Sequence, residues 1–291
     1  MKTARRTLLW QLALRLRYDL LAVVVVATVA TALTERVSLE RFTSMLSLLG
    51  VVASIFIGFR LRSAYSTWLD AQKLWEAVGV NSRALMNALT IVDNCTPQMA
   101  AVTDRMLRRQ VRHVWELAAE LRRVPPAPEV PMLTPEDPSD ATAVDLLAYQ
   151  AADSRYLTLA ELIDSKARNI LTNLNTAAAG TTGGLKVIRD EPFPVQYVIF
   201  VRPVVWMFGA LICASTHGVG LSGLTAIAAG VGVMAILVVA ERLGDIIGQP
   251  LDQTVFGLPT DRFCTRITAD LLGADHPLAR HAVKPANHAA E

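Results

Sequence analysis

Four long apolar stretches constrain this chain more than any other feature of its sequence. They run from Leu20 to Leu33, from Met45 to Phe59, from Val195 to Ser215 and from Leu221 to Ala240. With their flanking residues, each approaches the roughly 20 residues that a helix needs to cross a bilayer. The chain is also 52% hydrophobic and only 19% charged, which is unusual for a soluble domain. We therefore predict a membrane protein with four transmembrane helices.

The positions of the basic residues predict how these helices are oriented. Residues 60–194 hold 15 of the 28 Lys and Arg residues, whereas the two loops on the other side hold only Arg36 and Arg41. Lys and Arg near the ends of spans accumulate on the cytoplasmic side of a membrane. We therefore expect both termini and the long middle segment to be cytoplasmic.

The middle segment carries the pattern of packed helices. Leu74, Val78, Leu85 and Leu89 recur at helical spacing, which predicts amphipathic helices. Residues 124–140 contain six prolines, so we predict a loop between two helical halves there. The sequence GTTGG at residues 180–184 predicts a break at the end of the second half.

Together these features predict an all-α fold, with about half of the chain in lipid. We expect the following segments: a basic amphipathic N-terminal helix (1–17), transmembrane helices 1 and 2 (18–62), a cytosolic helical domain (63–191), transmembrane helices 3 and 4 (192–240), a cytosolic C-terminal segment (241–273) and a disordered tail (274–291).

The sequence contains no pattern typical of an active site or of a metal site. The five histidines are scattered, and Cys95, Cys213 and Cys264 show no CxxC spacing, as a zinc or redox site would require. The glycines of residues 180–184 lack the Lys-Ser/Thr pair of a phosphate loop. A net charge of +2 gives no reason to expect nucleic acid as a partner. We predict no enzyme, no cofactor and no metal.

Arg202 is the one charged residue inside an apolar stretch. A charge in hydrocarbon must pair with another group or reach water. Arg202 lies about 10 Å into its span, so either a packing ion pair or contact with the interface accounts for it. A role in conduction is the alternative.

One face of the second apolar stretch suggests a pore. Val51, Ile55 and Phe59 are spaced by four residues, and Ser47 continues the same face. If several copies surround an axis, these residues form apolar rings below a polar vestibule at Ser47, and such a constriction closes by losing water. Ordinary packing of a membrane helix explains the same apolar residues, and both alternatives stay open on periodicity alone.

The segment that follows this face resembles the signature of the bestrophins and their bacterial homologues. That signature joins a Gly-Phe-Arg end of the second span to an aromatic-acid-x-x-Lys-Leu-Trp helix and a turn with Val, Asn, Ser and Arg. The matching residues here are Gly58, Phe59 and Arg60, then Trp68, Asp70, Lys73, Leu74 and Trp75, then Val80, Asn81, Ser82 and Arg83. Further matches are Pro192, Pro194 and Tyr197, and Pro250, Leu258, Pro259, Asp261 and Cys264. The resemblance covers residues 10–270.

The resemblance implies a homopentameric ion channel with four membrane helices per subunit around one central pore. It implies a membrane neck formed by Val51, Ile55 and Phe59, and a second, cytosolic constriction at Lys166. A ring of five lysines favours anions, so we predict a passive chloride or anion channel of a bacterial inner membrane. A sodium or potassium channel of the same fold is the alternative. A non-conducting membrane scaffold with a partner-binding cytosolic domain is the alternative from another class.

The sequence departs from the family in one segment that bears on metals. Eukaryotic bestrophins bind calcium through an acidic cluster after the fourth span, and here Asp252 is the only acid in the corresponding stretch, PLDQTVFGLP. Calcium needs several oxygen ligands. A single carboxylate therefore argues against calcium gating, and we expect no metal site. The partners that we expect are inorganic ions, lipid and other copies of the chain.

Overall fold

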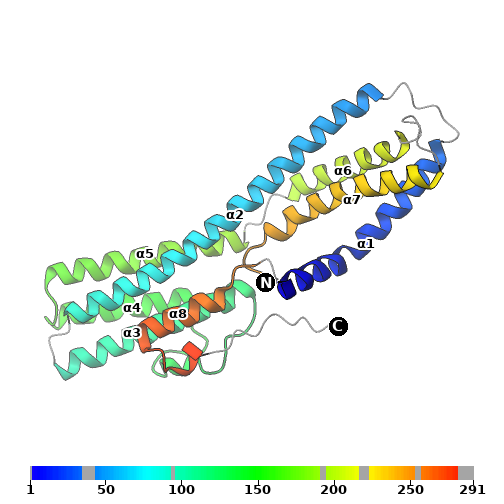
Figure 1. Cartoon of the computed structure of the whole chain (residues 1–291). Coiled ribbons are helices and arrows are strands. Elements are labelled where there is room, and N and C mark those ends of the chain that lie inside the picture. Colours follow the sequence, from blue (N-terminus) through cyan, green and yellow to red (C-terminus); the bar gives the residue numbers. More distant parts are fainter. Residues whose placement is uncertain are drawn as a thin grey trace. The chain divides into compact units, whose positions relative to one another are not determined.

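The computed structural model describes the backbone of residues 2–34, 43–92, 96–190, 195–215, 223–252 and 257–280. Its side chains are described for residues 16–32, 48–91, 96–190, 199–215, 224–252 and 257–280. Every regular element in these ranges is an α-helix or a short 3₁₀-helix, and none is a strand (Figure 1). The prediction of an all-α fold is confirmed.

The chain divides into two compact units. Unit one contains Met1–Trp68 and Pro192–Gln249, and unit two contains Leu69–Glu191 and Pro250–Glu291. Helix α2 (Thr43–Val92) is 50 residues long and contributes to both units. The division therefore falls inside one uninterrupted helix.

Unit one is built from the apolar stretches. Its helices are α1 (Lys2–Thr34), the first half of α2, α6 (Val195–Ser215) and α7 (Gly223–Ile247). A buried cluster joins Val23 and Ala27 of α1 to residues of α6 and α7. Among the described residues, two helical segments, Leu48–Ile91 and Leu224–Ile247, are long and apolar enough to cross a membrane, and Ile199–Ser215 is a shorter apolar helix.

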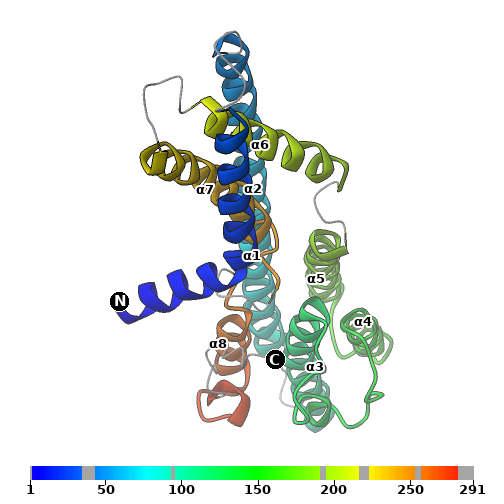
Figure 2. The same ribbon diagram turned by 90° about the vertical axis from the view of Figure 1, so that its right-hand side faces the viewer.

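Unit two is a bundle of amphipathic helices. It contains the second half of α2, α3 (Pro97–Arg122), the 3₁₀-helix η2 (Pro131–Leu133), α4 (Ala143–Leu159), α5 (Ser165–Asp190), α8 (Thr260–Leu272) and the 3₁₀-helix η4 (Pro277–Arg280). Figure 2 shows α8 on one side of α3 and α4 on the other. The core joins apolar residues of α2, α3, α4 and α5: Leu85, Ala88, Leu89, Met99, Val102, Met106, Leu157 and Leu171.

Local sequence signals explain where several of these helices begin and end. Thr96 accepts a hydrogen bond from the backbone N–H of Met99, and Pro97 occupies the first turn of α3, where its missing N–H costs nothing. Thr142 and Asp145 form a reciprocal capping box at the start of α4. At the end of α4, Glu161 has a φ of 53°, and its N–H bonds to the Thr158 carbonyl. These features fix the helix ends independently of tertiary packing.

Two predicted breaks are wrong, because the helices continue through them. The resemblance implied a turn near Val80–Arg83, but α2 runs on to Val92. The glycine-rich segment 180–184 lies inside α5 rather than at its end. Gly184 faces Leu74, and a Cβ atom there would lie 3.1 Å from the Leu74 Cδ1 atom. Close packing between α5 and α2 therefore accounts for this glycine and offsets its poor helix propensity.

Candidate functional site

An exposed apolar face runs along α2 in unit one. Val51, Ile55 and Phe59 are 58%, 50% and 62% exposed. The opposite face of the same helix is buried, with Ala53, Ile57, Arg60 and Ala64 all below one-tenth exposed. Apolar side chains that are exposed in a single chain are available to lipid or to other copies of the chain.

The buried face of α2 packs on α6 and α7. Ile57 joins Val201 and Val205 of α6 in a buried cluster. Gly244 of α7 lies against the side chain of Arg60. A Cβ atom on Gly248, directly after the end of α7, would lie 3.7 Å from that of Ala64. Small residues spaced by four allow helix backbones to approach closely in membranes.

An ion cluster connects all four helices of unit one. Its members are Asp19 of α1, Arg60 of α2, Arg202 of α6, and Glu241, Arg242 and Asp245 of α7. The three arginines balance the three carboxylates in formal charge. Charged groups in such apolar surroundings persist when they pair with one another.

The ion pairs within this cluster differ in length and in hydrogen bonding. Arg60 forms a hydrogen-bonded ion pair with Asp245, and Arg242 Nη2 donates to Asp19 Oδ1 at 2.6 Å. Arg202 lies 3.4 Å from Asp245 and 3.6 Å from Glu241. The carboxylate of Glu241 is 1% exposed and accepts no hydrogen bond from the described residues, although three arginines lie within 4.0 Å of it. Of the explanations considered for Arg202, the structure shows the packing ion pair.

The cluster fixes the rotation of α2 about its own axis. Arg60 is held on the side of α6 and α7, and one turn of helix contains 3.6 residues. Val51, Ile55 and Phe59 are thereby kept on the opposite, uncovered side. Nothing in the spacing of apolar residues reveals this cluster, because its members are spread from residue 19 to residue 245.

The structure places the other predicted site residues in different elements. Lys166 is exposed in the first turn of α5, in unit two, and forms no ion pair with any residue whose side chain the structure describes. The neighbouring Asp164 accepts a hydrogen bond from the backbone N–H of Ala167 at 2.7 Å, and so caps α5. Ser47 lies in α2, but its side chain is outside the described residues.

The proline-rich loop of residues 124–140 is anchored to α3 by two buried arginines. Arg109 forms paired hydrogen bonds of 2.7 Å to both oxygens of Asp137 and also contacts Asp153. Burial alone would raise the pKa of Asp137, but the hydrogen bonds and the charge of Arg109 lower it below its usual value. Arg112 donates to the carbonyl oxygens of Thr134, Pro138 and Ser139. The loop is therefore held in place over its second half.

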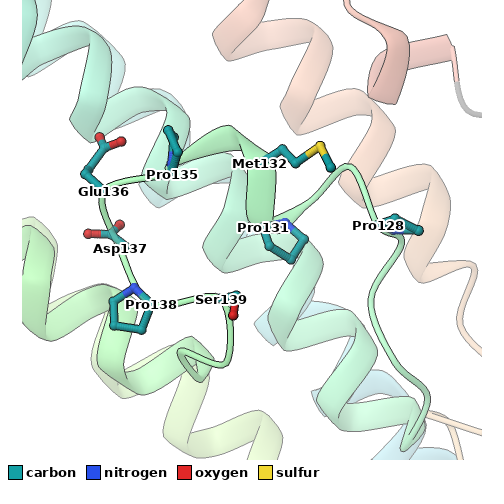
Figure 3. A pocket seen from close by; sticks show the side chains of 8 residues that line it. All are labelled: Pro128, Pro131, Met132, Pro135, Glu136, Asp137, Pro138 and Ser139. Carbon is teal, nitrogen blue, oxygen red and sulfur yellow. The ribbon is translucent and has the colours of Figure 1, made fainter.

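A hollow of about 680 Å³ lies on this loop (Figure 3). Its lining consists of Pro128, Pro131, Met132, Pro135, Glu136, Asp137, Pro138 and Ser139. No Lys, Arg or His occurs between residues 124 and 154. The hollow is thus apolar with acidic residues, and it suits the scaffold alternative.

A buried histidine connects three helices of unit two. His113 of α3 donates from Nδ1 to the carbonyl oxygen of Ala143 at 2.9 Å, and its Nε2 lies 3.3 Å from the hydroxyl of Thr182 in α5. Burial lowers the pKa of His113 to about 4, although the Ala143 carbonyl and Glu120 act in the opposite direction. The imidazole is therefore neutral at physiological pH. It serves packing rather than proton transfer.

Asp252 is the single acid in the segment PLDQTVFGLP, which corresponds to the calcium-binding segment of the eukaryotic proteins. Its carboxylate is already paired with an arginine. It forms an ion pair with Arg189 of α5. Within the described ranges, no three His, Cys, Asp or Glu side chains are grouped as metal ligands. Hard cations require several free oxygen ligands, and an arginine-bound carboxylate does not supply them.

These features define a class of protein: over its described residues it is helical, two of its segments are long and apolar enough to cross a membrane, and one long helix has an uncovered apolar face opposite an ion cluster. Residues 4–273 match the family model described as Bacterial/Fungal Bestrophin protein. The chain belongs to the Bacterial/Fungal Bestrophin family.

Curated relatives agree with this assignment. The voltage-dependent anion channel-forming proteins YneE of Escherichia coli K12 and of Salmonella typhi are 24% and 23% identical to this chain over 236 residues. The matches cover 78% of this chain and 74% of each relative. The family and these relatives point to a channel and not to an enzyme.

Solved structures share the fold. A mutant of a bacterial bestrophin homologue from Klebsiella pneumoniae superimposes with a TM-score of 0.78 and 22% identity, over 89% of this chain and 98% of that one. A second structure, described as that of a membrane protein, gives a TM-score of 0.79 at 21% identity with the same coverage. At this identity the likeness establishes the architecture.

Proposed function

We propose that the chain forms a homopentameric, anion-conducting channel in a bacterial inner membrane, with α2 from each copy lining a central pore. The observation that carries this proposal is the uncovered apolar face of α2 at Val51, Ile55 and Phe59. Membership of the bestrophin family and the similarity to relatives named as anion channel-forming proteins support it.

In this proposal, the neck is the part of the pore that controls conduction. Five copies of Val51, Ile55 and Phe59 form three stacked apolar rings spaced by about 6 Å along the helix. Such rings resist hydration, so the neck opens when water fills it and closes when water leaves. Ser47 borders the vestibule above the rings. Ions cross passively, without a cofactor or a bound metal.

Lys166 forms the second, cytosolic constriction in this proposal. Its exposure and its lack of an ion pair within the described side chains leave its ammonium group available to ions. Five ammonium groups around one axis attract anions and repel cations. Both termini are cytoplasmic, because the basic residues concentrate in the middle segment and the tail.

Recording from purified protein in planar bilayers tests the neck. The triple variant Val51→Ala, Ile55→Ala and Phe59→Ala widens the rings, so open probability or unitary current should rise. A matched control truncates Val24, Val25 and Val29 to Ala, which are exposed apolar residues of α1. Unchanged currents in an intact neck variant would show that the pore lies elsewhere.

Two further measurements separate the alternatives. Native mass spectrometry in detergent should give five chains, and a stable dimer would overturn the pentamer. In a chloride gradient, Lys166→Glu should shift the reversal potential toward cation selectivity. A reversal potential at the potassium equilibrium value in the unaltered protein would favour the cation channel. Absence of any current from an assembled pentamer would favour the scaffold, with the hollow of the proline-rich loop as its docking site.

A further inference from the structure

Two arginines that are two residues apart on α2 have opposite surroundings. Arg60 is 4% exposed and lies in the ion cluster. Arg62 is exposed, and forms no ion pair with any residue whose side chain the structure describes. Two residues correspond to about 200° of helix rotation, so the two guanidinium groups point to opposite sides of α2.

Arg62 lies on the same face as the apolar residues of the neck. Eleven residues separate it from Val51, which is about three turns plus 20°. Three residues, or about 4.5 Å of helix axis, separate it from Phe59. The first charged side chain beyond the apolar rings on this face is therefore an arginine.

No acidic residue balances the charge of Arg62 on the exposed face before Asp70. Tyr65 and Ser66, the next exposed positions on that face, are uncharged. Asp70 and Lys73 then follow, and their side chains form an ion pair of 3.0 Å with one another. Between Phe59 and Asp70 the face carries one net positive charge per chain.

We propose that Arg62 is the residue that selects anions at the cytosolic end of the neck, an inference that rests on the proposed pore function of α2. An ion that leaves a dry constriction meets the nearest fixed charges while it is still incompletely hydrated. Five guanidinium groups within one helical turn of Phe59 stabilise an anion there and repel a cation.

Arg62 and Lys166 differ in what they predict for selectivity. Lys166 belongs to unit two, and its role depends on how α5 is arranged in the assembly. Arg62 belongs to the helix that carries the neck itself, so its place on the pore axis follows once α2 lines the pore. If both act, neutralising either residue alone lowers the anion preference, and neutralising both lowers it further.

Reversal potentials in a potassium chloride gradient test the inference. Arg62→Gln should lower the chloride-to-potassium permeability ratio by about threefold or more, since the ring loses five charges close to the ion path. Arg62→Lys should keep most of it. The control is Arg155→Gln, which removes another exposed arginine, in α4, and should leave the ratio unchanged.

A cysteine variant allows the charge at residue 62 to be changed after the pentamer has assembled, so the result does not depend on how well the charge variants assemble. In Arg62→Cys pentamers already conducting in a bilayer, a cationic methanethiosulfonate should restore the anion preference, and an anionic one should reverse it. The native protein is the reagent control, because it carries the same native cysteines, of which Cys213 and Cys264 are buried.

Failure of the role proposed for Arg62 can be distinguished from failure of the proposed pore. Unchanged selectivity in conducting Arg62→Gln pentamers, together with no effect of either reagent on Arg62→Cys, overturns the role of Arg62. In that case a neck variant that still alters the current leaves the proposed pore intact. If the neck truncations also leave the current unchanged, the pore assignment of α2 fails first.

Discussion

Gly244 of α7 lies directly against the side chain of Arg60 of α2. A Cβ atom at residue 244 would be 3.0 Å from the Arg60 Nε atom and 3.1 Å from its Cγ and Cδ atoms. The absence of a side chain at Gly244 therefore gives the buried arginine the space in which it reaches Glu241 and Asp245.

We expect Gly244→Ala to destabilise unit one. The added methyl group forces the stem of Arg60 to move inside a packed region, and overpacking of this kind costs about 1–3 kcal/mol. The measurement is the thermal midpoint of the detergent-solubilised protein, followed by size-exclusion chromatography. Gly232→Ala is the matched control on the same helix, since a Cβ atom there meets nothing within 4 Å. Equal midpoints for the two variants would contradict the prediction.

Stability should depend on pH through His113. Its folded-state pKa of about 4 lies below the ordinary value of 6.5, so the unfolded chain binds a proton between these values and the folded chain does not. Stability is therefore lost as the pH falls from about 6.5 to about 4, by about 3 kcal/mol in total, with no further loss from this group below pH 4.

Comparing unfolding midpoints between pH 4 and pH 7 checks this dependence. His113→Gln should show a flatter profile than the native protein, at a lower stability near pH 7 because the hydrogen bonds to Ala143 and Thr182 are altered. His276→Gln, near the end of the described chain, should keep the native slope. A native slope in His113→Gln would assign the pH dependence to other groups.

We expect Glu161→Gly to stabilise unit two by about 0.5–1 kcal/mol. Glu161 has a left-handed backbone conformation, with φ 53°, which is costly for residues with a Cβ atom and free for glycine. The Leu162 N–H bonds to the Leu157 carbonyl in the same motif, so the backbone hydrogen bonds remain. The measurement is the unfolding midpoint. Arg155→Gly, inside α4, should instead lower it by a similar amount.

Asp137→Asn should loosen the proline-rich loop. The substitution removes the charge that faces buried Arg109 and one of its paired hydrogen bonds, while Asp153 still contacts the arginine. Glu129 and Glu136 are exposed in the folded loop, and a loosened loop more often reaches the extended conformation that a glutamate-specific protease binds, so cleavage should become several-fold faster. Asp70→Asn, which alters an exposed ion pair with Lys73 in α2, is the control. Equal cleavage rates would show that Asp137 does not anchor the loop.

Periodicity and composition were sufficient to predict the helical architecture. The stretch from Val195 to Ser215 coincides with α6, because apolar runs of this length form helices in lipid. The glycines at residues 180–184 predicted a break that α5 does not have. Propensity describes a helix in isolation, whereas Gly184 is placed by its contact with Leu74 of another helix.

The candidate site was predictable only in part. Spacing by four residues placed Val51, Ile55 and Phe59 on one face, and their exposure agrees with that placement. The ion cluster was not predictable, because Asp19, Arg60 and Glu241 are close only in the folded chain. The opposite surroundings of Arg60 and Arg62 could not be predicted either, because the sequence does not show which side of α2 is covered.

The continuity of α2 restricts how the length of this helix can change. Its buried positions keep one angular position along both halves, from Ala53 and Ile57 to Ala71 and Trp75. A single inserted residue between them would turn every later side chain by about 100°. Insertions of about 7, 11 or 18 residues, close to whole numbers of turns, preserve the alignment. Homologous channels should therefore differ in the length of this helix by such steps, and shorter insertions should be confined to the loops.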